Sequence, residues 1–401
     1  MKSGSLPAIT MQIINLLFIY LTPKEISHFK KSSVFPIVKN SEREALFKTN
    51  GNFLLAIGIF FFTFFSFCTN IKEKKSIVRI GVPPRVSFLP IYTALEKGIF
   101  KKNGVNVDLV LDEKVNEMYM ERKLDIICTG LTEPILFSSE GHNTQIVYRF
   151  SYSIENDIII ANPKIKNLES LFKKKVGFDG VNTSSHIFVQ QLLSKKGISE
   201  GEYYAVNVPV NRVMEELEKG TIDAGHTNGI SISDVKKKGW NIIGRSADDP
   251  DLLSDTLSVD TVFLKNHSFE VEKIIASIIE ARELYATNPA ESIAILANKI
   301  GKKQENVKEE LSGVRFLSLR ENIQSLKTSD SQKTNSIYPQ GMSVIENPNH
   351  GMNLNLTEKK GALFTAGETI ISFLRERGQL YKMPILESII NDKFVNVQEL
   401  K

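Results

Sequence analysis

Residues 77–111 decide the fold, and they read IVRIGVPPRVSFLPIYTALEKGIFKKNGVNVDLVL. The stretch opens with Ile77–Val82, an apolar and β-branched run closed by two prolines, which predicts a buried strand. Ile91–Lys97 predicts a short helix, which ends at Gly98, where a left-handed residue is favoured. Val105–Leu111 predicts the next strand. The order strand, helix, strand indicates α/β layers over parallel sheets.

The same order of elements continues along the chain. Asn116–Lys123 predicts a helix and Asp125–Cys128 a strand. A second unit of the same kind covers residues 176–244, with predicted strands at 176–178, 203–208, 222–225 and 240–244 and predicted helices at 184–196, 213–219 and 231–238.

The remaining segments connect and cover these units. Asp157–Ala161 and Thr256–Leu264 are extended apolar runs, placed where the chain would cross between the units and return. The rest is mostly helical, and residues 320–356 predict a long connection because they are rich in Ser, Asn and Gly without a period. The predicted helices of this part are 269–286, 290–300, 304–311 and 359–377.

Bulk composition excludes two protein classes. The chain has 401 residues, enough for two cores, and its 50 basic and 46 acidic residues leave a formal charge of +4. This small, dispersed excess argues against nucleic-acid binding. The only cysteines are Cys68 and Cys128, too few for a disulfide framework. Cys128 lies in an apolar run that reads as a buried strand, which favours a small core residue over a nucleophile.

The first 75 residues indicate export. Phe53–Phe67 is apolar and shorter than a membrane-spanning helix, a length typical of signal peptides. Cys68 follows at once and a Lys-rich segment comes next, so the region resembles a bacterial lipoprotein signal with Cys68 as the lipidated residue. Phe67 departs from the small residue usual before that cysteine, and an uncleaved N-terminal anchor stays open. Residues 1–45 fit neither form, and we expect the native start near Leu46.

Three stretches resemble the ABC-transporter receptors for nitrate, sulfonates, taurine and thiamine precursors. The first is FLPIYTALEKGIFKKNGVNV at 88–107. The second is KLDI at 123–126 with Thr129-Gly130 behind it, and the third is LEKGTIDAG at 217–225. The resemblance covers about residues 77–300.

This resemblance implies a type II-like periplasmic-binding-protein fold. It has two lobes built on two mainly parallel sheets flanked by helices, with the ligand cleft between them. We place the signal and tether at 1–75, lobe 1 at 76–160 plus 260–401, and lobe 2 at 161–259. The implied function is an extracytoplasmic solute-binding receptor of an ABC importer. Its partners are a small polar or anionic ligand, the permease subunits and the membrane, and no cofactor or metal is implied.

Candidate ligand contacts follow from the strand ends. In open α/β sheets, ligands bind beyond the carboxyl ends of strands and beside helix N-termini. Four loops meet this rule, and their candidate residues are Arg85, Ser87 and Phe88, then Thr129, Gly130 and Thr132, then Asn182, Thr183, Ser184 and Ser185, and finally His226 and Asn228.

Each candidate also has a structural alternative. The hydroxyl and amide groups of 182–185 form an anion or carbonyl site at a helix start, or merely cap that helix. Arg85 pairs with a ligand anion or is a solvated surface residue. Phe88 stacks on a planar ligand or belongs to the core. His226 contacts the ligand or makes a structural hydrogen bond.

Two other function classes stay open. The chain has no Cys-x-x-Cys, His-Glu-x-x-His or Gly-x-Ser-x-Gly motif, and its six histidines show no metal-ligand spacing. An enzyme of thiamine- or menaquinone-precursor type on the same fold is the first alternative. The second is a lipid-anchored sensory or interaction protein.

Overall fold

The computed structural model describes residues 77–230, 232–328 and 360–399. Residues 75–401 form one compact unit. The predicted signal segment, Cys68 and most of the connection expected at 320–356 lie outside the described residues.

The first sheet has six strands in the order β11-β4-β10-β3-β1-β2. β1 pairs in parallel with β2 and β3, whereas β10 runs antiparallel to β3 and β4, and β4 runs antiparallel to β11. The bounds are β1 Ile77–Val82, β2 Asn106–Leu111, β3 Ile126–Gly130, β4 Thr144–Ser153, β10 Ser254–Asp260 and β11 Val314–Phe316.

The second sheet has five strands in the order β7-β6-β8-β5-β9. β6 pairs in parallel with β7 and β8, and β5 lies antiparallel between β8 and β9. The bounds are β5 Asp157–Ala161, β6 Lys175–Phe178, β7 Tyr204–Asn207, β8 Ala224–Asn228 and β9 Asn241–Arg245.

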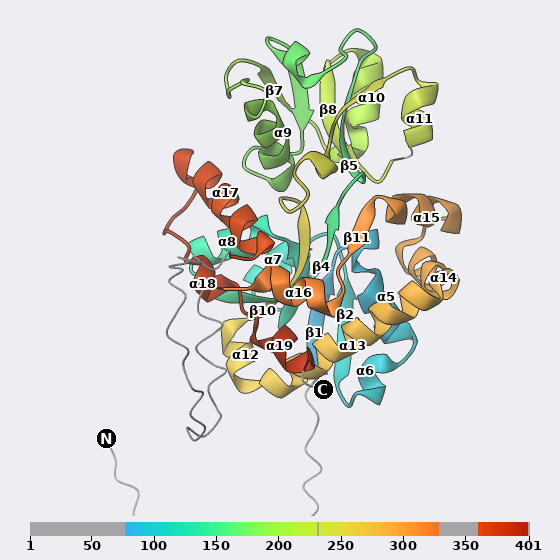
Figure 1. Cartoon of the computed structure of the whole chain (residues 1–401), viewed down its shortest axis with the longest axis vertical. Coiled ribbons are helices and arrows are strands. Elements are labelled where there is room, and N and C mark those ends of the chain that lie inside the picture. Colours follow the sequence, from blue (N-terminus) through green and yellow to red (C-terminus); the bar gives the residue numbers. More distant parts are fainter. Residues whose placement is uncertain (1–76, 231, 329–359, 400–401) are drawn as a thin grey trace, which may run out of the picture. The chain divides into compact units, whose positions relative to one another are not determined.

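The two sheets are the bases of lobe 1 and lobe 2, and the chain passes between them twice (Figure 1). β5 carries it from the first sheet into the second, and β10 brings it back, so we call these two the crossing strands. Both crossings fall a few residues before the predicted boundaries at 160/161 and 259/260.

The prediction of mainly parallel sheets was wrong, because both sheets are mixed. Each crossing strand arrives directly from the other lobe without a covering crossover helix. Such a strand enters antiparallel to its neighbours, since only a crossover of a dozen or more residues returns the chain to the same edge in parallel.

Helices cover the sheets much as the sequence predicts. Gly98, with φ +67°, separates α5 from α6 in the left-handed conformation that glycine tolerates. In lobe 1 the helices are α5 Leu89–Glu96, α6 Ile99–Lys102, α7 Val115–Met120, α8 Thr132–Ser139, α12 Thr261–Asn266, α13 Ser268–Thr287, α14 Pro289–Ile300, α15 Gln304–Ser312, α16 Leu319–Leu326, α18 Leu386–Ile389 and α19 Lys393–Glu399. In lobe 2 they are α9 Ser184–Ser194, α10 Val213–Lys219 and α11 Ile232–Lys237.

The start of the expected connection at 320–356 is helical, which corrects the prediction. α16 begins with a capping box in which the Ser318 hydroxyl accepts from the Glu321 N–H and the Glu321 carboxylate accepts from the Ser318 N–H. Such a box satisfies two backbone donors at once and fixes the helix start. Its Asn322 side chain then bridges the backbone N–H and C=O of Arg149 on β4.

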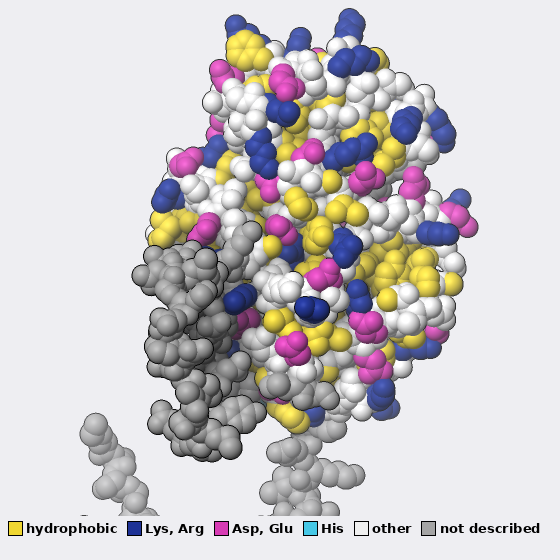
Figure 2. Space-filling view, in the orientation of Figure 1, with side chains coloured by type: hydrophobic (Ala, Val, Ile, Leu, Met, Phe, Trp, Pro, Cys, Tyr) yellow, Lys and Arg dark blue, Asp and Glu magenta, His cyan; other side chains and the backbone are white. Residues whose placement is uncertain are grey.

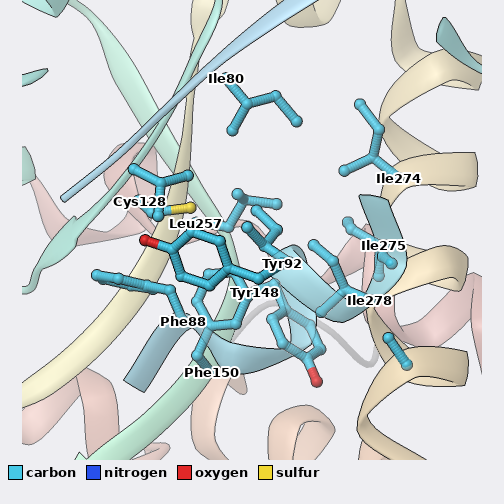
Figure 3. Close-up of a cluster of buried hydrophobic side chains, with 14 of the residues drawn as sticks. Ile80, Phe88, Tyr92, Cys128, Tyr148, Phe150, Leu257, Ile274, Ile275 and Ile278 are labelled. Atoms are coloured by element: carbon cyan, nitrogen blue, oxygen red, sulfur yellow. The ribbon is translucent and has the colours of Figure 1, made fainter. Parts of the chain in front are cut away.

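The core of lobe 1 gathers between the first sheet and α5 and α13 (Figure 3). Phe88 and Phe150 meet edge to face with ring centroids 5.3 Å apart, an arrangement worth about 1 kcal/mol beyond burial. Cys128 lies in the same cluster as a free, buried thiol, and burial raises its pKa. It therefore packs as a small apolar residue.

A second buried cluster takes side chains from both lobes. α17, Ala362–Glu376, supplies Phe364 and Leu374, which pack in one cluster with Ile135 of α8 and Phe188 of α9. Beyond the helix end, Arg377 pairs with Glu200 of lobe 2. α17 therefore joins the lobes in addition to the two crossing strands (Figure 1).

Acidic and basic side chains are interspersed on the face shown in Figure 2, without a large patch of one sign. Within the described parts of the chain, no helix is both long and apolar enough to span a bilayer.

Candidate ligand-binding site

Each crossing strand carries an aspartate near the point where the chain changes lobes. Asp157 begins β5 and is 13% exposed, and Asp255 is the second residue of β10 and is partly exposed. The pKa of Asp255 is raised to about 6, chiefly by burial. The charge of Asp157 also raises this pKa, while Arg85 and hydrogen bonds from Ser87 and Ser151 lower it. The two carboxylates are thus close enough to repel each other.

Strand pairing builds a row of residues on one face of the first sheet. Asp255 of β10 lies opposite Gly130 of β3 on one side and Ser151 of β4 on the other. Residues directly opposite in an antiparallel pair project from the same face. Accordingly, the Ser151 hydroxyl donates to Asp255 at 3.2 Å. A register shift between β10 and β4 follows this row, a bulge of the kind that often re-aims side chains beside functional sites.

Gly130 has no side chain, so Glu133 of α8 can approach this row. A Cβ on Gly130 would lie 2.9 Å from an oxygen of Glu133, so the Glu133 carboxylate covers the position where a side chain would stand. That oxygen, Oε2, is buried and has no hydrogen-bond partner. The row therefore presents an acceptor at Glu133 as well as at Asp255.

The lobe 2 side is ordered by a chain of hydrogen bonds. The Ser185 hydroxyl lies 2.7 Å from His226 Nδ1, and His226 Nε2 lies 3.0 Å from Asp157 Oδ1. Ser185 Oγ already accepts from the Asp179 N–H at 3.0 Å, so its proton is directed to Nδ1 and Nε2–H donates to the carboxylate. Although burial alone would raise it, the His226, Ser153 and Asn228 bonds leave the pKa of Asp157 below its usual value.

The start of α9 combines capping with an unusual backbone. Thr183 is the N-cap, and its hydroxyl accepts from the His186 N–H at 3.3 Å and donates to the Asp179 carbonyl at 2.6 Å. Asn182 has a left-handed φ of +66°, and its N–H donates to His186 Nδ1 at 3.1 Å. The Asn182 side-chain oxygen is buried without a partner. Capping is therefore one role of this segment, and the side-chain oxygen of Asn182 is left as an acceptor for a ligand.

The structure brings some of the sequence-predicted residues together and separates others. Ser87 and Arg85 approach Asp255, and the Asn228 amide donates to Asp157 at 3.3 Å. Other predicted residues serve the protein itself. Phe88 is fully buried in the core, Thr129 Oγ1 donates to Asn116 at 3.2 Å, and Thr132 is buried in the first turn of α8. His226 and Ser185 bond each other, and Ser184 begins α9 and is partly exposed.

Sequence reasoning missed the acidic part of the site. Asp157 and Asp255 lie at the edges of the apolar runs that predicted the crossings, and Glu133 follows a loop that was singled out for its hydroxyl groups. A charged residue at the edge of such a run was the available signal. Its meaning depended on which strands pair, because pairing places Asp255 beside Ser151.

Two other observations concern metal binding and the location of the site. Among the residues that the structure describes, no group of three or more His, Cys, Asp or Glu side chains is arranged to hold a metal ion. A surface hollow of about 510 Å³ lies elsewhere on lobe 1, lined by residues that include Leu264, Lys265 and Phe394. The crossing strands contribute nothing to it, so the polar groups around Asp157 and Asp255 remain the candidate site.

Comparison with solved structures shows the fold. The periplasmic aliphatic sulphonate binding protein SsuA from Escherichia coli matches with TM-score 0.60 and 14% identity, over 79% of this chain and 97% of that one. A periplasmic sulfonate-binding protein from Methylobacillus flagellatus matches with TM-score 0.61 and 17% identity, over 82% and 96%. DszB in complex with biphenyl-2-sulfinic acid matches with TM-score 0.56 and 11% identity, over 81% and 99%.

Comparison at the level of sequence identifies the family. No curated protein sequence matches the chain significantly. A family model described as NMT1/THI5 like matches residues 85–292, more than half of the chain, including both crossing strands and the loops around Asp255. The protein therefore belongs to the NMT1/THI5-like family and has the two-lobed α/β fold of periplasmic binding proteins.

Proposed function

We propose that this protein is an extracytoplasmic receptor that binds one small solute between its lobes and delivers it to an ABC importer. The observation that carries the proposal is the position of the polar groups. Asp157 and Asp255 lie on the two strands that cross between lobes, and polar side chains from both sheets surround them. When two lobes close around a ligand, groups from both lobes contact it near the crossing strands, which is where these polar side chains lie.

The receptor comparison supports the same conclusion. Two of the matched structures are periplasmic sulfonate-binding proteins by name, and each is covered over more than nine-tenths of its length. The partners proposed for this chain are accordingly a small solute and permease subunits. The contacts proposed for the solute are Arg85, Ser87, Gly130, Asn182, Ser184 and Asn228, to which the structure leads us to add Asp255 and Glu133.

Anchoring is a separate part of the proposal and rests on the sequence. We propose that Cys68 carries a lipid and holds the lobes on the outer side of a bacterial membrane. Cell fractionation of a Cys68→Ser variant tests this, since loss of the lipid should release the protein from the membrane fraction. A variant that stays in the membrane would instead indicate an uncleaved anchor.

A thermal-shift screen tests the receptor function. The full-length protein is melted with sulfonates, nitrate, pyrimidines, carboxylates, amino acids and amines. A ligand present at 100 times its Kd stabilises the folded state by about 2.7 kcal/mol, which moves the melting temperature by several degrees. One class of solute should produce such a shift and remain chemically unchanged. Silence across the whole panel would count against a receptor.

An enzyme on this fold is the second candidate, favoured by the Ser185–His226–Asp157 chain. Its distances of 2.7 and 3.0 Å match a nucleophile, a base and an orienting carboxylate. Against it, Ser185 is only 5% exposed and its hydroxyl is held by the Asp179 N–H. Turnover of a bound solute that disappears in Ser185→Ala would establish the enzyme and displace the receptor.

A further inference from the structure

The sequence predicts a small polar or anionic ligand, but the site has few positive charges to hold an anion. Among the described residues of the loops that follow β1, β3, β6 and β8, Arg85 is the only lysine or arginine. Arg85 is exposed, and its charge lowers the pKa of Asp255. Arg149, the nearby buried arginine, donates to Asp251 at 2.8 Å and to Ser325 at 2.7 Å, and its Nε is buried without a hydrogen-bond partner.

Two carboxylate acceptors lie at the same place. Asp255 accepts hydrogen bonds from the Ser87 and Ser151 hydroxyls and remains partly exposed. Glu133 Oε2 is buried without a partner, although α8 begins one residue before it and the helix dipole favours a negative charge there. An enclosed carboxylate oxygen without a donor is costly, and a ligand N–H would satisfy it.

Strand geometry brings these two acceptors onto one face. Asp255 and Gly130 are direct partners, so their side-chain positions are about 5 Å apart on the same side of the sheet. Glu133 Oε2 occupies the position above Gly130, 2.9 Å from where its Cβ would stand. A donor group placed over this ladder would reach Asp255 directly, and it would reach the enclosed Glu133 Oε2 once the Glu133 side chain turns toward it. A sulfonate placed there would be repelled by both carboxylates and by Asp157.

We propose that the solute carries a positively charged nitrogen group with several N–H donors, such as an ammonium or an amidinium, and that Asp255 is the residue that selects for it. This inference rests on the proposed receptor function and narrows it to organic cations. Glu133 provides the second acceptor.

Matched probes test the proposal on the full-length protein. Benzamidine and benzenesulfonate have the same ring and opposite charge, and butylamine and butanesulfonate form an aliphatic pair. Their affinities are measured by calorimetry for the wild type, Asp255→Asn and Asp108→Asn. Asp108 is an exposed residue of β2 in the same lobe, so its variant controls for the loss of one carboxylate.

The expected result is binding of the cation in each pair, weakened at least tenfold in Asp255→Asn and unchanged in Asp108→Asn. A Ser151→Ala variant, which keeps the carboxylate, should retain the preference for the cation. Tighter binding of either sulfonate, or a cation affinity that ignores Asp255→Asn, would overturn the inference and leave the receptor standing. Binding of neither series would overturn both.

Discussion

Replacing Asp255 by asparagine should stabilise the free protein at neutral pH. The folded structure raises the pKa of this carboxyl from 3.8 to about 6, chiefly by burial, so the charged form is disfavoured there relative to the unfolded chain. A difference of about two units corresponds to about 3 kcal/mol at roughly 1.4 kcal/mol per unit. Asparagine keeps an acceptor for Ser87 and Ser151 without the charge, so most of this penalty should disappear.

The sign of the pH dependence follows from proton binding. Because the folded state holds the Asp255 proton more tightly, this residue costs nothing below pH 4, and its cost grows as the pH rises to about 6. Urea unfolding of the wild type and Asp255→Asn at pH 4, 5, 6 and 7.5 should therefore give curves that separate as pH rises. Equal stabilities at pH 7.5, or a variant that is less stable there, would refute this reasoning.

Three further substitutions follow from contacts outside the charged site, each checked by urea unfolding at neutral pH. Thr183→Ala removes the N-cap of α9 and should cost about 1 kcal/mol, whereas Thr183→Ser should restore it. Asn322→Ala leaves the buried N–H and C=O of Arg149 without partners and should cost about 2–4 kcal/mol. Phe373→Ala empties the contact of α17 with His186 and should cost about 3 kcal/mol; an effect below 1 kcal/mol would show that α17 does not join the lobes.

The repeated α/β units were predictable from the sequence because their signals are local. Alternating apolar runs and a glycine after a helix, such as Gly98, follow from backbone sterics alone. β4 gave no such signal, since Arg149, Ser151 and Ser153 interrupt its apolar pattern. Their side chains bond Asp251, Asp255 and Ser246, partners about 90 to 105 residues away in the chain.

The candidate site also has a part that could be predicted from the sequence and a part that could not. Loops at the carboxyl ends of strands could be named in advance, because their place follows from the strand–helix order. The roles of His226 and Ser185 could not, since His226 bonds both Ser185 and Asp157 only after β5 and β8 pair. The selectivity proposed for Asp255 likewise depends on tertiary neighbours, and the sequence alone pointed to a polar or anionic ligand instead.

Lobe closure on a bound solute is the most direct test of the receptor. Spin labels are placed at Leu111 and Val181, which are 39% and 63% exposed beside strand ends of lobe 1 and lobe 2, in a chain where Cys68 and Cys128 are replaced. The distance between the labels is measured by pulsed electron resonance without ligand and with a saturating solute identified in the screen. Our account predicts a shorter and narrower distance distribution with the solute. An unchanged distribution, with binding confirmed by calorimetry on the same sample, would contradict it.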